Sequence, residues 1–297
     1  MKIMIGSEGM GIWGRKVIDY LLHIIYPKIE IEYKNSATCD YIIASHFSNH
    51  EPLWNITFKK YIYWSGESYT PVKSIYERQY IYILTTIQSS IINSLYIPYF
   101  LYSPHLYKAR KYTNQNRKYI LAYCNSNKIR EREQIFDIFV KNTSDKLCHS
   151  YGSCFGSYPS TKSKKVDGGW EGQQLIDTYK DYTFVIAMEN KCLEGYITEK
   201  ILNAFYSGAI PIYWGSSNIN EFFNEKAFIN VNNFNTFEDC VTYAINMDTR
   251  LIKQMTEEPI YNTLSDLGNL LNDNYNRTND NKVLKEYSEK IEKFLSI

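Results

Sequence analysis

Residues 184–215 read FVIAMENKCLEGYITEKILNAFYSGAIPIYWG and place two short apolar runs on either side of an amphipathic segment. The runs over residues 183–188 and 209–214 are rich in aliphatic and aromatic side chains, which is typical of buried strands. Thr198 is a residue type that caps helices and Gly208 is one that ends them, so a helix is predicted over residues 198–207. Strand, helix and strand in this order predict a βαβ unit with parallel strands.

Polar side chains gather where the first of these strands ends and the helix begins: Glu189, Asn190, Tyr196, Glu199 and Lys200. A helix N-terminus presents unpaired N–H groups and the positive end of the helix dipole, so it attracts anions. With the charge of Lys200 added, the pattern fits a diphosphate, and Asn190 or Glu199 could then bond ribose or sugar hydroxyls. A capped helix with a surface lysine would show the same residue types, and composition alone does not separate these two hypotheses.

The same alternation extends over the rest of the chain. Further strands are predicted over residues 2–6, 29–33, 41–45, 61–65, 119–124 and 227–231, and further helices over residues 15–26, 129–141, 170–182 and 236–247. Strands separated by helices predict an α/β fold with open parallel sheets.

The length of 297 residues suits two domains. The segment over residues 150–169 is rich in Gly, Ser and Lys, and we expect the domain boundary there. This predicts an N-terminal α/β domain over residues 1–155, a C-terminal Rossmann-like domain over residues 156–270 and a helical tail over residues 271–297. Ligands are expected in a cleft between the domains, at the carboxyl ends of the strands.

Charge, hydropathy and cysteine usage limit the class of protein. With 33 basic and 32 acidic side chains the net charge is +1, which gives no general attraction to nucleic acid. The sequence contains neither a signal-peptide pattern at its start nor 18 consecutive apolar residues. Its six cysteines are scattered and without zinc spacing, as is typical of reduced thiols. We expect a cytoplasmic protein without a membrane span, with peripheral membrane association left open.

The segment that opened this section resembles the donor-binding signature of the α1,3/4-fucosyltransferases, glycosyltransferase family 10. The resemblance rests on Glu189-Asn190, on Tyr196-Ile197-Thr198-Glu199-Lys200, on Ala204-Phe205 and on Ile210-Pro211-Ile212-Tyr213-Trp214-Gly215. Upstream, it includes Tyr63-Trp64-Ser65-Gly66-Glu67, Tyr96-Ile97-Pro98-Tyr99, Asn125-Ser126-Asn127 and Arg132-Glu133-Gln134-Ile135-Phe136-Asp137. It covers residues 61–234. Gly195 stands where many family members have Asp, and this departure concerns the choice of acceptor more than the chemistry.

The resemblance implies a GT-B fold, in which two Rossmann-like domains face each other across a cleft. It implies an inverting transfer of L-fucose from GDP-fucose, bound by the C-terminal domain, to a glycan hydroxyl bound by the N-terminal domain, with O3 of GlcNAc as the expected position. Glu67 follows a predicted strand and would be the general base that takes the proton of the acceptor hydroxyl.

Arg132 and Lys200 would bind the donor phosphates, since a planar guanidinium suits bidentate phosphate contacts. Arg130 would take this role if the register slipped by two residues. Asn190, Tyr196 and Glu199 are expected around the sugar and ribose. His46 and His50 follow a predicted strand and are candidates for the lining of the acceptor pocket.

The sequence indicates no metal site and no cofactor. It contains no Asp-x-Asp motif, which many sugar-nucleotide enzymes use to hold a divalent cation on the diphosphate, and its five histidines show no ligand spacing. We therefore expect metal-independent transfer, in which Arg132 and Lys200 take the place of the cation.

Three alternatives remain. One is a GT-B transferase that uses a different nucleotide sugar. Another is a non-catalytic carbohydrate-binding protein on a decayed transferase scaffold, and the intact Glu67, Arg132, Glu199 and Lys200 argue against it. The third follows from GMGIWG, residues 9–14, which matches the G-x-G-x-x-G fingerprint of nicotinamide-dependent oxidoreductases. That match is weakened by the intervening Gly6-Ser7-Glu8, because Glu8 would place a carboxylate beside a pyrophosphate.

Overall fold

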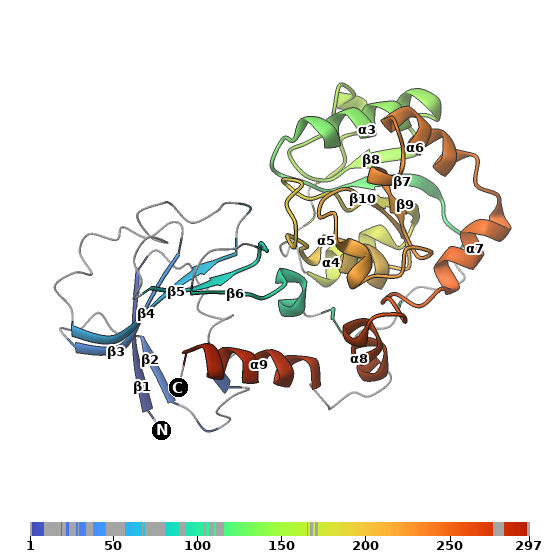
Figure 1. Cartoon of the computed structure of the whole chain (residues 1–297). Coiled ribbons are helices and arrows are strands. Elements are labelled where there is room, and N and C mark those ends of the chain that lie inside the picture. The colour runs from blue at the N-terminus through green and yellow to red at the C-terminus, as the bar shows by residue number, and fades with distance from the viewer. Residues whose placement is uncertain are drawn as a thin grey trace. The chain divides into compact units, whose positions relative to one another are not determined.

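The computed structural model describes residues 2–8, 19, 22–23, 28, 30–33, 38–45, 57–66, 68, 81–88, 93–103, 105–106, 110, 116–164, 166, 169, 172–275 and 282–295. The chain forms two compact units, each with its own sheet (Figure 1). The first unit comprises Met1–Leu101 together with Asp280–Ile297, and the second comprises Tyr102–Asn279.

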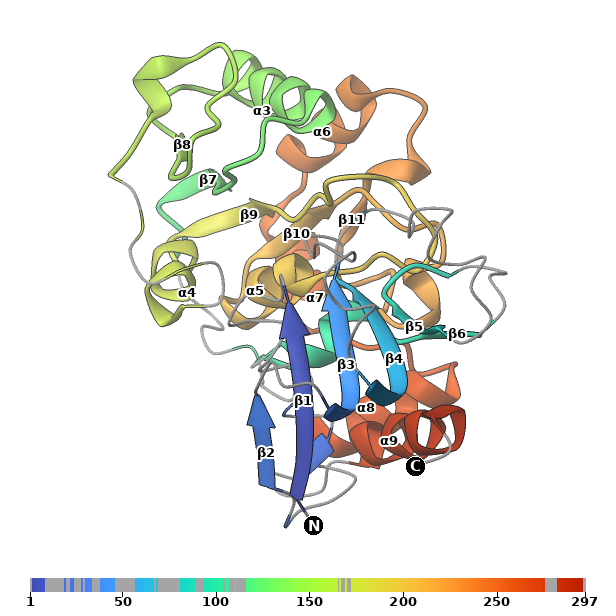
Figure 2. The ribbon, with the colours of Figure 1, turned by 90° about the vertical axis from the view of Figure 1, so that its left-hand side faces the viewer.

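The first unit is built on a sheet of six parallel strands in the order β2-β1-β3-β4-β5-β6. The strands are β1 (Lys2–Glu8), β2 (Glu30–Tyr33), β3 (Thr38–Ser45), β4 (Thr57–Ser65), β5 (Ile81–Thr85) and β6 (Ser94–Tyr96). Figure 2 shows β1, β3 and β4 running side by side. Ile42, Ile62 and Ile83 are fully or almost fully buried in the middle of their strands. The C-terminal helix α9 (Lys282–Leu295) belongs to this unit.

The second unit carries a parallel sheet of five strands in the order β11-β10-β9-β7-β8. The strands are β7 (Tyr119–Tyr123), β8 (Cys148–Ser150), β9 (Tyr182–Ile186), β10 (Ile210–Tyr213) and β11 (Ile229–Asn230). The helices are α3 (Arg130–Asn142), α4 (Gln173–Tyr179), α5 (Glu199–Tyr206), α6 (Phe237–Ile245), α7 (Thr249–Glu257) and α8 (Asp266–Tyr275), with 3₁₀ turns at Pro159–Thr161, Ile219–Glu221 and Val231–Asn233. A further 3₁₀ turn, Tyr99–Tyr102, includes the last residues of the first unit and the first residue of the second.

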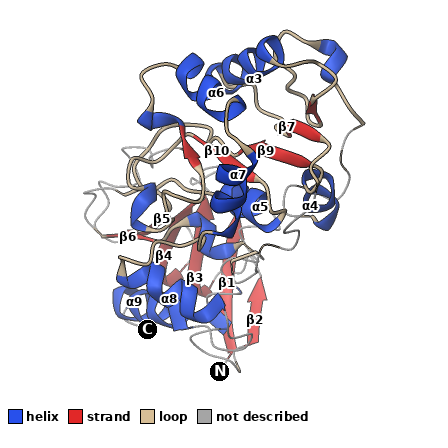
Figure 3. Cartoon of the chain, turned by 90° about the vertical axis from the view of Figure 1, so that its right-hand side faces the viewer, coloured by secondary structure: helices blue, strands red, loops and turns tan. Residues whose placement is uncertain are grey.

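Helices cover both faces of the second sheet. Helices α3 and α6 lie together on one face, and α4 and α5 lie on the other (Figures 1 and 3). One face packs aliphatic and aromatic side chains of the strands against α3 and α6, including Leu121, Phe184 and Ile212 from the strands and Phe136 and Phe139 from α3. A parallel sheet buried on both faces explains why these strands are almost continuously apolar in sequence.

Both sheets have the same strand order when their strands are numbered from the start of each unit: the second strand lies outside the first, and the later strands follow on the other side. The order therefore reverses between β1 and β3, and again between β7 and β9. In sheets of this kind ligands bind at such a reversal, beyond the carboxyl ends of the strands. In the second unit this position lies after Tyr123 and Ile186.

The predicted α/β class with parallel sheets is confirmed, and most of the predicted strands are found within a few residues of their expected ends. The predicted helix over residues 170–182 is shorter, because α4 ends at Tyr179 and Tyr182 already belongs to β9. The predicted helix over residues 15–26 lies almost wholly outside the described residues.

The expected boundary near residue 155 is not where the structure divides. Strands β7 and β8 and helix α3, assigned by sequence to an N-terminal domain over residues 1–155, belong to the second sheet and its cover. The Gly/Ser/Lys-rich segment is a connection within the second unit, since Ser153 and Cys154 donate backbone N–H groups to Asn125 O at 2.9 and 3.2 Å. Likewise, α9 groups with the first unit instead of forming a separate tail over residues 271–297.

None of the described helices is both long enough and apolar enough to cross a membrane.

Candidate functional site

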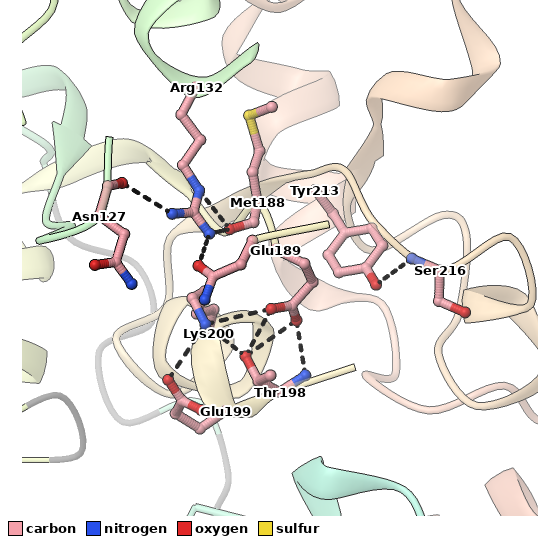
Figure 4. A network of polar contacts seen from close by, with 10 residues as sticks. Asn127, Arg132, Met188, Glu189, Thr198, Glu199, Lys200, Tyr213 and Ser216 are labelled. Atoms are coloured by element: carbon pink, nitrogen blue, oxygen red, sulfur yellow. Dashed lines mark hydrogen bonds and ion pairs between the residues drawn. The ribbon is translucent and has the colours of Figure 1, made fainter. Parts of the chain in front are cut away.

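The polar residues singled out in the sequence meet at the strand-order reversal of the second sheet. The loop after β7 carries Asn127, and the first turn of α3 carries Arg132. The loop after β9 carries Glu189 and Asn190, and α5 begins with Glu199 and Lys200. Figure 4 shows Glu189 beside Thr198 and Lys200. All of them belong to the second unit.

Arg132 joins the two sides of this reversal. Its side chain is fully buried, and Nε and Nη2 donate to the carbonyl oxygen of Met188 at 2.9 and 2.6 Å. Nη2 also donates to Oδ1 of Asn190 at 2.8 Å, and Nη1 donates to the carbonyl oxygen of Asn127 at 3.4 Å. The guanidinium therefore holds the backbone beyond β9 against the loop beyond β7 and orients the side chain of Asn190.

Burial lowers the pKa of the Arg132 guanidinium, and the negative charge of Glu189 acts in the opposite direction. Four of its five N–H groups serve the contacts just described, which leaves one on Nη1. Arg130, the alternative phosphate contact, lies at the start of the same helix with an exposed side chain. The two arginines thus differ sharply in environment although they are only two residues apart.

Glu189 is a fully buried carboxylate beside the N-terminus of α5. Oε1 accepts the backbone N–H of Thr198 at 2.7 Å, and the Thr198 hydroxyl lies 3.0 and 2.9 Å from the two carboxylate oxygens. The Lys200 ammonium donates to Oε2 at 3.2 Å and to the Thr198 hydroxyl at 2.8 Å. Thr198 was predicted as the N-cap and holds that position, but its hydroxyl bonds this carboxylate instead of a helix N–H.

The charges around Lys200 are largely balanced. The ammonium is also 3.7 Å from Oε1 of Glu199, and its side chain is only 19% exposed. Burial alone would lower the pKa of Lys200, but the two carboxylates outweigh it and raise the pKa above its usual value. Burial raises the pKa of Glu189, against the opposing effect of Lys200. The positive charge expected at this helix start is therefore present, but it is already paired.

Asn190, Tyr196 and Glu199 complete the set of predicted donor-binding residues. Asn190 is half-buried, whereas Tyr196 and Glu199 are 3% and 6% exposed. Tyr196 lies close enough to Arg132 to act on the pKa of its guanidinium, in the direction that opposes the effect of burial. The structure thus brings all five predicted donor residues into one region of the second unit.

Two glycines allow the loops around Glu189 to approach each other. A Cβ on Gly215 would lie 2.7 Å from Cγ of Glu189 and 2.7 Å from the hydroxyl of Tyr213. Gly195 has a φ of +82°, a region that favours glycine, and its N–H is bonded by the side chains of Ser216 and Asn218 at 2.7 and 3.1 Å. Residue 195 therefore has a left-handed backbone, which a glycine adopts without strain.

The predicted residues of the first unit cannot be placed. Glu67, His46, His50 and the glycine-rich segment over residues 9–14 lie outside the described residues. The strands before them are described: β3 ends at Ser45 and β4 ends at Ser65.

The buried pairing of Glu189 was missed at the sequence level, although the residue was grouped with the polar set. Its signal was present: a carboxylate directly after a buried strand and nine residues before an N-cap. Within the described ranges, no group of three or more His, Cys, Asp or Glu residues is arranged to hold a metal ion.

Comparison with known proteins points in the same direction. The model of the family described as glycosyltransferase family 10 (fucosyltransferase) C-term matches residues 111–253. The chain is 27% identical over 195 residues to the alpha-(1,3)-fucosyltransferase FucT of Helicobacter pylori, and this match covers 58% of this chain and 38% of that protein. It is 29% identical over 199 residues to 4-galactosyl-N-acetylglucosaminide 3-alpha-L-fucosyltransferase 9 of Rattus norvegicus, covering 64% of this chain and 50% of that protein. The chain thus matches half or less of the length of these relatives.

A crystal structure of an alpha1,3-fucosyltransferase with GDP superposes with a TM-score of 0.65. The match covers 96% of this chain and 90% of that one, at 17% sequence identity. This likeness shows that the fold is of the GT-B type.

Proposed function

We propose that this chain, a member of glycosyltransferase family 10 through residues 111–253, transfers L-fucose from GDP-fucose to a glycan hydroxyl. The observation that carries the proposal is the convergence of Arg132, Asn190, Tyr196, Glu199 and Lys200 at the strand-order reversal of the second sheet. The match to the family model includes all five residues.

The chemistry required is a displacement at the anomeric carbon, in which the leaving group is a nucleoside diphosphate. Negative charge grows on the diphosphate as its bond to fucose breaks, and fixed cationic donors stabilise that charge. Lys200 has two N–H groups engaged by Glu189 and Thr198, and the third can meet a phosphate oxygen. Arg132 has one remaining N–H and holds Asn190 in place.

We assign Glu67 as the general base for the acceptor hydroxyl and expect inversion at the anomeric carbon. Two features of the chain support the assignment: Glu67 comes two residues after β4, and parallel strands of this sheet end at one edge. The acceptor hydroxyl that we propose is O3 of GlcNAc, in keeping with the 3-alpha-L-fucosyltransferase named among the relatives. His46 and His50, after β3, remain candidates for acceptor contacts.

The test begins with donor choice. The protein is incubated with GDP-fucose or with other sugar nucleotides on a glycan array, in the presence and absence of EDTA. We expect labelling with GDP-fucose, unchanged by EDTA, on glycans that end in GlcNAc-containing units. Transfer from a different sugar nucleotide would replace the donor assignment, and loss of transfer with EDTA would contradict the metal-independent mechanism.

Glu67→Ala tests the base separately. We expect kcat to fall by about 100- to 10,000-fold, the usual contribution of general base catalysis, while GDP still binds. Retained turnover in this variant would remove Glu67 from the base role without affecting the donor site.

A further inference from the structure

Glu189 has no place in the proposed chemistry, yet it is the most completely enclosed carboxylate of the donor site, with no exposed surface. A buried carboxylate is costly unless several donors satisfy it. The contacts of Glu189 divide into a group that anchors the residue and a single flexible partner, the Lys200 ammonium.

The anchoring contacts come from three places in the second unit. The backbone N–H of Glu189 donates to the carbonyl oxygen of Trp214 at 2.7 Å, which extends the pairing of β9 with β10. Gly215 leaves room for its Cγ, and Thr198 bonds its carboxylate through both backbone and hydroxyl. The carboxylate is therefore held by the sheet and by the start of α5 through contacts that do not involve Lys200.

The Lys200 ammonium, by contrast, lies at the end of a flexible four-carbon side chain that has many available rotamers. Its ammonium meets Glu189 Oε2 at 3.2 Å and the Thr198 hydroxyl at 2.8 Å, and Glu199 Oε1 lies beyond hydrogen-bond distance at 3.7 Å. The side chain keeps 19% of its surface exposed. The fixed members of the cluster thus determine where the ammonium lies, and two of its three N–H groups are engaged by Glu189 and Thr198.

We infer that Glu189 is a positioning residue: its anchored carboxylate fixes the Lys200 ammonium so that one N–H is presented to the donor's diphosphate. A lysine ordered before the donor binds does not have to be ordered during the reaction, and preorganised donors of this kind contribute most to catalysis. Glu189 itself does not touch the substrate. Its effect on nucleotide binding therefore passes through Lys200.

The simplest alternative predicts a change of GDP affinity in the opposite direction. If Glu189 acted on the donor only through its negative charge, it would repel the diphosphate, and Glu189→Gln would strengthen the binding of GDP. If Glu189 only stabilised the fold, Glu189→Gln would lower the affinity for GDP by the same factor whether or not Lys200 is present.

The first experiment needs no nucleotide. The wild-type protein is labelled with an amine-reactive reagent over a range of pH, and the reactivity of Lys200 is compared with that of the exposed Lys162 by mass spectrometry. We expect the midpoint for Lys200 to lie above that for Lys162, and Glu189→Gln to raise the reactivity of Lys200 severalfold at a fixed pH, because loss of the carboxylate lowers the pKa of the ammonium. A Lys200 midpoint at or below that of Lys162, or unchanged reactivity in Glu189→Gln, would overturn the inference.

Asp137→Asn is the matched control. Asp137 accepts the backbone N–H and the hydroxyl of Ser157, each at 2.7 Å, as Glu189 accepts those of Thr198, but among the described residues no lysine is bonded to it. The control variant should leave the labelling of Lys200 unchanged. A similar rise of Lys200 reactivity in both variants would show a general loosening of the unit and count against positioning.

The second experiment rests on the proposed function, because it measures GDP affinity by calorimetry. Glu189→Gln should weaken GDP binding about tenfold, a size typical of coupling between contacting charged residues. In a Lys200→Met background, the same substitution should change the affinity less than about twofold. Equal losses in both backgrounds, or tighter binding in the single variant, would overturn the inference.

Glu189→Asp keeps the charge but shortens the side chain, and it should fall between wild type and Glu189→Gln in both measurements. A wild-type protein that binds no GDP would contradict the proposed function, while the labelling result would still decide whether Glu189 positions Lys200. The two failures are therefore distinguishable.

Discussion

At the scale of single residues, the guanidinium of Arg132 links segments that are 56 residues apart in the chain. It is completely buried, and its acceptors are a backbone carbonyl of the β9 loop, the amide of Asn190 and a carbonyl of the β7 loop. A side chain with this environment contributes to the fold of the donor site as well as to its charge. Removing it would take both of its hydrogen bonds from the carbonyl oxygen of the buried Met188.

Arg132→Leu should therefore lower the free energy of unfolding by about 2–4 kcal/mol, since buried acceptors are left unsatisfied. Arg130→Ala, two residues earlier and exposed, should change it by no more than about 0.5 kcal/mol. Urea denaturation followed by fluorescence measures both. Equal effects would contradict the burial of Arg132, and loss of GDP binding in Arg130→Ala alone would move the phosphate contact to Arg130.

His149 offers a second residue-scale test, through pH. Its ring bonds the Tyr182 hydroxyl at 2.7 Å and packs edge-on against Tyr119 and Tyr182. Burial lowers the pKa of His149 below its usual value, so the unfolded chain binds this proton more readily than the folded protein does.

The contribution of His149 to stability is therefore complete above the unfolded pKa of about 6.5, and it is lost as the pH falls through the lower, folded value. We expect the protein to lose stability between pH 7 and pH 5, and His149→Gln to flatten that part of the profile. Thermal unfolding of both proteins at a series of pH values measures how their stability depends on pH. An identical slope in the variant would show that other groups cause the loss.

At the scale of elements, helix α5 connects the core of the second unit to the proposed donor site. Ile201, Leu202, Ala204 and Phe205 are buried, and the same helix begins at the Glu189–Lys200 pair. The helix ends at Tyr206 with Ser207 as its C-cap, and the next residue is Gly208, whose φ of +77° lies in the left-handed region and whose N–H donates to the carbonyl oxygen of Phe205 at 2.9 Å. The orientation of Lys200 thus depends on packing along the whole helix.

Gly208→Ala should cost about 1 kcal/mol of stability, because a Cβ disfavours the left-handed conformation. Gly208→Asn should recover part of this loss, since Asn tolerates that region better. Guanidinium denaturation of the wild type, Gly208→Ala and Gly208→Asn gives the order of their stabilities. An alanine variant as stable as wild type would show that the helix ends in a different conformation.

At the scale of the whole molecule, the division of the chain is decided by sheet membership. Strand β7 lies inside the second sheet, paired with β8 on one side and β9 on the other. Helix α3, which follows β7, supplies Phe136 and Phe139 to the core of that unit. A fragment that begins after residue 155 lacks all of these elements.

A fragment over residues 102–279 should therefore fold cooperatively and bind GDP, whereas one over residues 156–270 should not fold, because it loses two of five strands and a helix of its core. Circular dichroism with thermal melting, followed by GDP titration, tests both fragments. Cooperative unfolding of the shorter fragment would contradict the boundary found in the structure. Failure of the longer fragment to bind GDP while folded would show that the donor site needs residues of the first unit.

Local patterns along the sequence determined the alternation of strands and helices and the parallel class of the sheets, and they indicated the set of residues that we propose to bind the donor. These are local properties: apolar periodicity, Thr198 before a helix, Gly208 after it and a family signature of some thirty positions. They could be recognised because each depends on neighbours only a few residues away.

Only the tertiary structure decided which sheet β7 and β8 join, that Arg132 is buried while Arg130 is exposed, and that Glu189 pairs with Lys200. The physical reason is that each of these depends on contacts between segments distant in sequence. A Gly- and Ser-rich segment has the same composition whether it links two domains or connects two elements of one. A carboxylate after a strand acquires its partners only when the next helix is packed beside it.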